Sequence, residues 1–183
     1  MQLTAQQQAL LEIIKQYVSD NYQEYEYSDV KFSLEVSASY IDDFDELVSL
    51  SDLKAAKTQK KGPEKKIPIK LTFTEKLMQL MNEKGLSAPE VYKYANLDKT
   101  LFSKMLSDSK YSPSKDTAIA TCFGLRLNLK EAKDLLDRAG YTLAHSIERD
   151  VALECCFKEG VTNVVDINIL LSELGHKPLG RKN

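Results

Sequence analysis

Apolar residues recur at helical spacing close to the start of the chain. One side of a helix drawn from this stretch carries Leu10, Leu11, Ile13, Ile14 and Val18. Thr4 precedes them, and Gln7 follows it three residues later, which is the pattern of a capping box at a helix start. The pattern predicts an amphipathic helix that ends near Asp20.

A second segment alternates between apolar and polar residues, which predicts a half-buried strand. Its apolar positions are Val30, Phe32, Leu34, Val36, Ala38 and Tyr40. A single strand leaves backbone groups unpaired, so either residues 22–27 or another chain should pair with it. Val30, Phe32, Leu34 and Val36 are therefore candidates for binding a partner's sheet. Asp42 and Asp43 then open a short predicted helix.

From Phe73 onward the pattern is helical throughout, and helix caps and glycines divide it into segments. We expect helices over residues 74–83, after Ser87, after Asp98, after Ser114 and after Asn128, with two more near residues 146–159 and 167–174. The first helix should turn Leu77, Met78, Leu80 and Met81 inward, and the second Val91 and Tyr94. Between the second and third helices, Asn96 is suited to a turn with left-handed backbone.

Charge divides the chain into three regions. Residues 1–53 carry a net charge of −9, residues 54–70 carry +6, and the remainder carries +1. The pattern predicts a small acidic α+β region at 1–53, a flexible basic linker at 54–70 and a helical domain at 71–183. A front region of this size buries little surface, so we expect it to form a homodimer or to bind a partner protein.

The string SAPEVYKYANLDKTLFSKMLSDSKYSPSKDTAIATCFGLRLNLKEAKDLL resembles the helix-turn-helix domain of lambda-repressor-like (XRE-type) regulators, over roughly residues 73–140. The resemblance implies a five-helix domain. Together with the patterns above it predicts a mainly α protein, in which this domain is followed by two extra helices and preceded by the small acidic α+β region. It also implies that the helix after Asp98 is the recognition helix. Lys99, Thr100 and Ser103 would then face base edges, and phosphates would be contacted by Lys104, Lys110, Ser114 and Lys115.

A different function is open for the same fold. The expected reading face has no Arg, Asn or Gln, the side chains that make bidentate contacts to bases. The lysines could also be an ordinary solvated surface. The alternative is an adaptor that binds partner proteins in a bacterial phage-defence or signalling system, because domains of this kind with added helices resemble modules of multi-domain bacterial proteins.

Enzymatic, metal and membrane functions find little support in the sequence. His145 and His176 have no nucleophile at a recognisable spacing, and the acids of residues 41–47 lack the spacing of a calcium loop. We therefore predict a protein that is not an enzyme, with no cofactor and no metal. No apolar run approaches membrane-spanning length and no secretion signal is seen, so a cytoplasmic location is expected. Cys122, Cys155 and Cys156 are predicted to be buried thiols.

Overall fold

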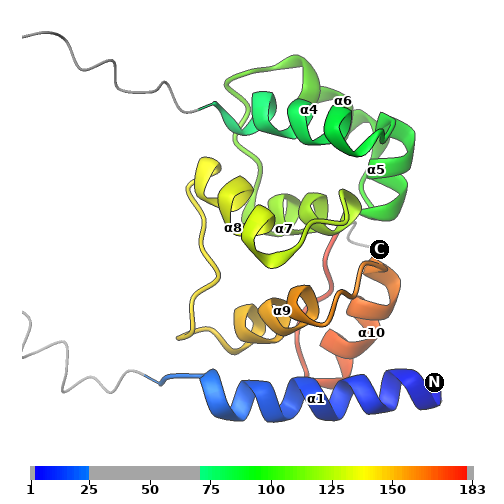
Figure 1. The fold of residues 1–183 in the computed structure, drawn as a ribbon, viewed down its shortest axis with the longest axis vertical. Helices are drawn as coiled ribbons and strands as arrows, with labels where there is room; N and C mark the ends of the chain where they lie inside the picture. Colours follow the sequence, from blue (N-terminus) through cyan, green and yellow to red (C-terminus); the bar gives the residue numbers. More distant parts are fainter. Residues whose placement is uncertain (1–2, 25–70, 181–183) are drawn as a thin grey trace, which may run out of the picture. The chain divides into compact units, whose positions relative to one another are not determined.

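The computed structural model describes residues 3–24 and 71–180 (Figure 1). These residues contain eight helices and no strand, so the part of the chain that the structure describes is all-α. The helices are α1 (Ala5–Asn21), α4 (Phe73–Lys84), α5 (Ala88–Tyr94), α6 (Lys99–Ser107), α7 (Lys115–Gly124), α8 (Leu129–Arg138), α9 (Glu148–Lys158) and α10 (Val164–Glu173). The predicted strand with Val30, Phe32, Leu34 and Val36, the helix after Asp42 and the basic linker lie outside the described residues.

Local sequence signals set most helix boundaries. The predicted capping boxes are present at Thr4, Ser87 and Asn128. The Thr4 and Asn128 side chains accept an N–H group that the first helical turn leaves unpaired, whereas at Ser87 the Glu90 carboxylate accepts the N–H and the hydroxyl of Ser87. Asp98 and Ser114 cap α6 and α7, as predicted. The chain leaves α4, α9 and α10 through glycines with positive φ, among them Gly85, as expected for helix ends of this kind.

Helix α1 packs on α9 and α10. The sequence placed this helix in the front region, whereas the structure groups residues up to Gln23 with the helical part of the chain as one compact unit. The physical reason is its apolar stripe of Leu11, Ile14 and Val18, which α9 and α10 cover. At its end, the Gln23 N–H donates to the carbonyl of His145 over 2.9 Å. A second unit, Glu24–Ile69, lies outside the described residues except for Glu24.

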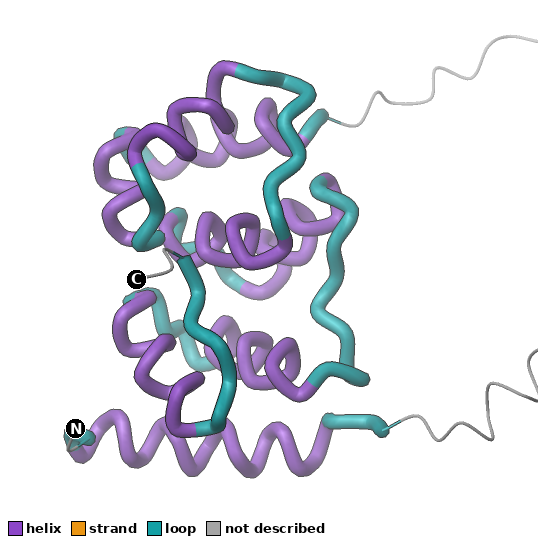
Figure 2. Tube along the Cα trace, turned by 180° about the vertical axis from the view of Figure 1, so that it is seen from behind, coloured by secondary structure: helices purple, strands orange, loops and turns teal. Residues whose placement is uncertain are grey.

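Helices α4 to α8 form a connected group. Helix α4 packs on α6 and α8, α5 packs on α6 and α7, and α7 packs on α8 (Figure 2). The buried faces follow the predicted periodicity at Leu77, Val91 and Phe102, each at most 1% exposed. Two inward predictions were wrong: Met78 is 41% exposed and Tyr94 is 45% exposed. Each lies at the edge of its helix's buried stripe, where a pattern of a few residues cannot fix the direction of a side chain.

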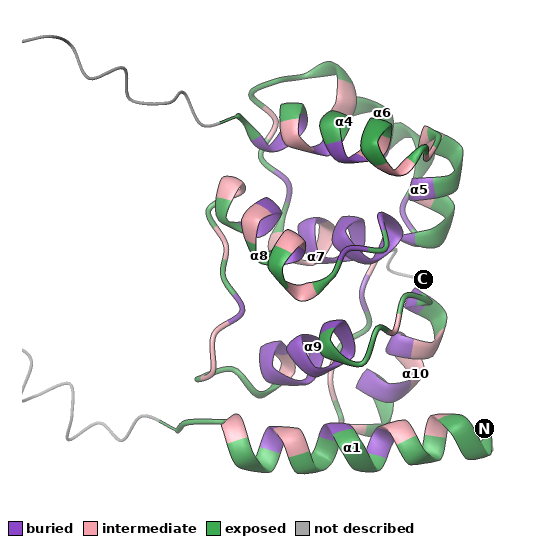
Figure 3. Cartoon of the chain, viewed as in Figure 1, coloured by how far each residue is buried: buried purple, intermediate pink, exposed green. Residues whose placement is uncertain are grey.

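Helix α9 lies at the centre of the packing. It contacts α1, α8 and α10, and its residues from Asp150 to Phe157 are all buried (Figure 3). Phe157 stacks on Phe123 of α7, with ring centroids 3.9 Å apart. A helix covered on all sides should be apolar all round, yet α9 buries two carboxylates, those of Asp150 and Glu154. Both need internal partners, because burying an unpaired charge is costly.

Glu154 gathers polar groups from three other segments. Its carboxylate accepts hydrogen bonds from Lys133 Nζ of α8 at 3.3 Å and from the Tyr17 hydroxyl of α1 at 3.4 Å, and it lies 3.2 Å from His145 Nε2. Burial raises the pKa of Glu154, but the hydrogen bonds and positive charges of His145 and Lys133 outweigh burial and hold the pKa below its usual value. The ionised carboxylate therefore ties α1 and α8 to α9.

The end of α5 lies unusually close to α7. A Cβ atom built on Gly124 would stand 2.7 Å from the Ala95 Cβ and 2.7 Å from the Val91 carbonyl oxygen. Only a residue without a side chain allows this approach, so Gly124 sets the distance between α5 and α7.

We predict that Gly124→Ala destabilises the protein. At an unconstrained helical position the same change stabilises by up to about 1 kcal/mol, because alanine is the better helix former. Here the added methyl group collides with Ala95, and overpacking of this kind costs about 1–3 kcal/mol. Urea unfolding measures directly whether the free energy of unfolding falls or rises. A variant more stable than wild type would mean that α5 moves away from α7 without cost.

We also predict that Glu154 makes stability depend on pH. Because its pKa is lowered in the folded protein, its contribution is complete above the ordinary value of 4.5 and is lost as pH falls through the folded pKa. Glu154→Gln should lower the free energy of unfolding at pH 7 by about 1–3 kcal/mol and flatten its fall in acid. Glu173→Gln, at an exposed position of α10, is the control. Identical acid profiles for wild type and Glu154→Gln would contradict the assignment.

Candidate nucleic-acid interface

Helix α6 presents four of the predicted site residues on one exposed face. The Asp98 carboxylate accepts hydrogen bonds from the N–H groups of Thr100 and Leu101, at 2.8 and 3.3 Å, and so fixes the start of the helix. Phe102 and Met105 are buried on the opposite face. The exposed residues of α6 are Lys99, Thr100, Ser103 and Lys104, together with Ser107 at its end. The structure therefore brings these four together at the surface, as the spacing predicts.

The far end of α6 is fixed to α4. The buried Thr74 hydroxyl of α4 donates to the carbonyl oxygens of Met105 and Asp108, at 3.0 and 3.2 Å. The Lys104 ammonium lies 5.6 Å from the centroid of the Tyr111 ring, which brings the loop after α6 next to the helix. With both ends held, α6 offers a rigid surface.

Lys110 and Ser114 lie in the loop between α6 and α7. The Asp108 carboxylate accepts a hydrogen bond from the Lys110 N–H at 2.9 Å, and the Lys110 side chain is exposed. Ser114 is the N-cap of α7, and its hydroxyl accepts the Thr117 N–H at 3.3 Å. The Tyr141 hydroxyl donates to the Pro113 carbonyl at 3.0 Å and holds the end of this loop. Both residues are at the surface, and Ser114 already has a structural task.

Lys115 has a partner inside the protein. Its ammonium pairs with the carboxylate of Asp150, a residue only 2% exposed on α9. The same Asp150 oxygen accepts the Ala144 N–H at 2.9 Å. Asp150 requires this cation because a buried carboxylate without a charged or hydrogen-bonded partner is strongly destabilising. Lys115 therefore differs from the other six predicted residues, because its ammonium joins α7 to α9.

The carboxylates near α6 are each held by local contacts. Asp98 caps α6, Asp108 holds the Lys110 N–H, and Asp116 pairs with Arg149 at 2.7 Å. At the start of α5, Glu90 closes a capping box, and hydrogen bonds from Ser87 lower its pKa. The negative charges of these acids reduce the positive potential that the lysines create.

Tyr94 and Arg126 form a contact that the sequence analysis missed. The Arg126 guanidinium carbon lies 4.5 Å from the centroid of the exposed Tyr94 ring, in the geometry of a cation–π pair. Arg126 follows the end of α7 and takes a left-handed backbone with φ of 52°, which is uncommon for a residue other than glycine. It adds a guanidinium to the α5 side of the surface. No local pattern in the sequence indicates this contact, because it depends on the crossing of α5 and α7.

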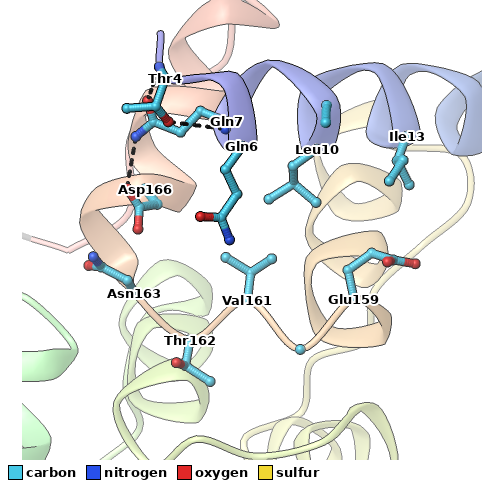
Figure 4. Close-up of a pocket in the computed structure, with 12 residues that line it drawn as sticks. Thr4, Gln6, Gln7, Leu10, Ile13, Glu159, Val161, Thr162, Asn163 and Asp166 are labelled. Carbon is cyan, nitrogen blue, oxygen red and sulfur yellow. Dashed lines mark hydrogen bonds between the residues drawn. The ribbon is translucent and has the colours of Figure 1, made fainter.

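Two hollows lie away from these residues. One of about 660 Å³ lies between α1 and the loop joining α9 to α10 (Figure 4). The Gln6 side chain extends into it, while Gln7 closes one end by donating to the Asp166 carboxylate at 2.9 Å. The other, of about 490 Å³, lies between α10 and the turn at Asn96. Neither is lined by a predicted site residue.

The cysteines are buried, as predicted. Burial raises the pKa of Cys122, that of Cys155 to about 11 and that of Cys156 to about 12, so the thiols are neutral and weakly reactive at physiological pH. Within residues 3–24 and 71–180, no group of three or more His, Cys, Asp or Glu side chains is placed to hold a metal ion. In the same residues every helix is too short or too polar to cross a bilayer.

Comparisons with known proteins found no relative. No protein-family model, no curated protein and no solved structure matches the chain.

We predict that Lys115 contributes to folding. Lys115→Met keeps the aliphatic stem but leaves the Asp150 carboxylate with only the Ala144 N–H, so the free energy of unfolding should fall by roughly 2 kcal/mol or more. Lys110→Met, at an exposed position of the preceding loop, should change it by less than about 0.5 kcal/mol. Urea unfolding of both variants makes the comparison. Equal stabilities would show that Asp150 does not depend on Lys115.

Proposed function

We propose that α4 to α8 form a five-helix helix-turn-helix domain of the lambda-repressor-like type, and that the protein binds duplex DNA through the exposed face of α6. The order and boundaries of these helices support the fold, as does the four-residue connection from Ala95 to Asp98 between α5 and α6. In such a domain the second helix of the pair enters the major groove with its N-terminal residues, and the first lies against the backbone.

The exposed face of α6 is the observation that carries the proposal. Lys99 and Lys104 are exposed, and within the described residues neither forms an ion pair with a carboxylate. Lys76, Lys84, Lys115 and Lys133 in contrast each pair with an acid of another segment. The α6 lysines are thus available for an external anion.

The residue types indicate how the DNA would be read. Lys99, Thr100 and Ser103 would lie nearest the bases, and Lys104 and Lys110 nearest the phosphates. A lysine supplies a point charge rather than the planar fork of arginine, so much of the affinity should be electrostatic and little of it sequence-specific. Ser114 would contribute through the N-terminus of α7, whose N–H groups favour an anion.

The wider biological part of the proposal follows from the sequence. We propose a regulator without enzymatic activity, in which the front region brings two copies together so that two recognition helices meet paired half-sites. Helix α1 buries its apolar stripe against α9 and α10, so residues 24–53 are the part of the front region to which we assign this pairing.

An adaptor function is the second candidate, and the Tyr94–Arg126 pair favours it. Tyrosine and arginine are enriched where proteins bind each other, and this tyrosine is 45% exposed beside an arginine. In this case the helical group would bind a partner protein of a bacterial phage-defence or signalling system, and the residues around Val30 to Val36 would add a strand to its sheet.

We predict salt-dependent binding to random duplex DNA, measured by fluorescence polarisation. Each phosphate contact contributes about 0.9 to the slope of log affinity against log salt, so Lys104→Gln should lower that slope by roughly this amount. Lys99→Gln/Lys104→Gln should weaken binding further. Lys15→Gln, which removes one exposed lysine from α1, should leave the slope unchanged. Absence of binding at low salt, with all variants folded, would refute the DNA proposal and favour the adaptor.

A further inference from the structure

The chain after α10 returns to the turn between α5 and α6. We name residues 176–180 the C-terminal strap; Figure 1 shows this segment in red, rising from the end of α10 towards α5. Its Leu179 side chain is fully buried. The Asn168 amide of α10 holds both backbone groups of Leu179, accepting its N–H at 2.6 Å and donating to its carbonyl at 3.0 Å. The strap is therefore firmly attached to α10.

The end of the strap touches the turn through its backbone. Gly180 has φ of +84°, and a Cβ built there would stand 2.7 Å from the Asn96 carbonyl oxygen and 3.2 Å from that of Ala95. Glycine is required here for two reasons: the backbone has a positive φ, and the backbone of the turn lies too close for a side chain. The same turn also meets Gly124, whose Cβ would stand 2.7 Å from the Ala95 Cβ. The turn is held between α7 and the strap.

This turn determines where α6 begins. Asn96 takes a left-handed backbone with φ of 52°, and the N–H groups of Asn96 and Leu97 bond back to Lys93 and Tyr92 at 3.1 and 2.9 Å. Asp98, the cap of α6, follows directly. The hollow of about 490 Å³ beside Asn96 is lined by residues of α10 and by Pro178 of the strap, so on this side the turn faces α10 and the strap.

We propose that the C-terminal strap is a positioning element for α6: it fixes the α5–α6 turn and so sets the orientation of the face that binds DNA. Helix α6 begins with Lys99 and Thr100, and Lys99 is three residues after Asn96. A displacement of the turn therefore moves both residues directly. Because Asn168 ties the strap to α10, and α10 packs on α1, the position of α6 depends on helices that carry none of the predicted site residues. The inference rests on the proposed function.

Gly180→Ala and Gly175→Ala form a matched pair for the test. Both residues have a positive φ, of +84° and +76°, so alanine adds similar backbone strain at either one. Only at Gly180 does the new methyl group meet the turn, since nothing lies within 4 Å of a Cβ at Gly175. Urea unfolding of both variants measures the shared strain. Amide hydrogen exchange at residues 96–102 then reports the turn and the start of α6, and fluorescence polarisation reports DNA affinity.

Gly180→Ala should speed exchange at residues 96–102 roughly tenfold relative to Gly175→Ala, because overpacking displaces the turn. It should also weaken DNA binding several-fold relative to Gly175→Ala. Asn168→Ala, which releases the strap without touching the turn, should change both readouts in the same direction.

Two results would overturn the proposal. Equal exchange in Gly180→Ala and Gly175→Ala would show that the strap does not hold the turn. Faster exchange with unchanged DNA affinity would show that the turn does not set the binding face. If the wild-type protein does not bind DNA, the proposed function fails and the role of the strap in binding fails with it, while the exchange data still decide whether the strap fixes α6.

Discussion

The burial of two carboxylates on α9 is the constraint on which the rest of the described structure depends. Asp150 and Glu154 lie one turn apart on a helix that is covered on every side. Neither can remain charged there without partners, and the partners come from different segments: Lys115 of α7, Lys133 of α8 and Tyr17 of α1. An apolar α9 would be positioned by side-chain packing alone. The paired charges add a further requirement, because an arrangement that separates either carboxylate from its partners leaves a buried charge unpaired, which is strongly destabilising.

The helices were predictable because residues close together in the sequence determine where each helix begins and ends. A capping residue and its partner are three positions apart, and the glycines that end helices follow within a residue or two, so the signals at Ser87 and Asn128 could be found by inspection. The placement of α1 was not predictable in the same way. Its stripe of Leu11, Ile14 and Val18 shows that it must pack on something, but the surface that covers it begins more than 120 residues later, on α9.

The same distinction between local and long-range signals applies to the candidate interface. Helical periodicity was enough to place Lys99, Thr100, Ser103 and Lys104 on one exposed face. It could not show that Lys115 is engaged, because Asp150 lies 35 residues further along the chain. Nor could it show that Arg126 reaches the Tyr94 ring. The charge that α6 offers is therefore carried by fewer groups than a count of lysines suggests, and nearby acids that serve as caps reduce it further.

The discontinuous packing of α1 has a consequence for the order of folding. Helices α4 to α10 are consecutive and contact one another over shorter sequence separations, whereas the Tyr17–Glu154 hydrogen bond joins residues 137 positions apart. Closing a loop of that size costs entropy before any contact compensates for it, and local contacts form first. We expect α4 to α10 to assemble early, with Glu154 already facing its α8 lysine, and α1 to complete the burial of α9 last. Helix α1 would then be synthesised first but would pack last.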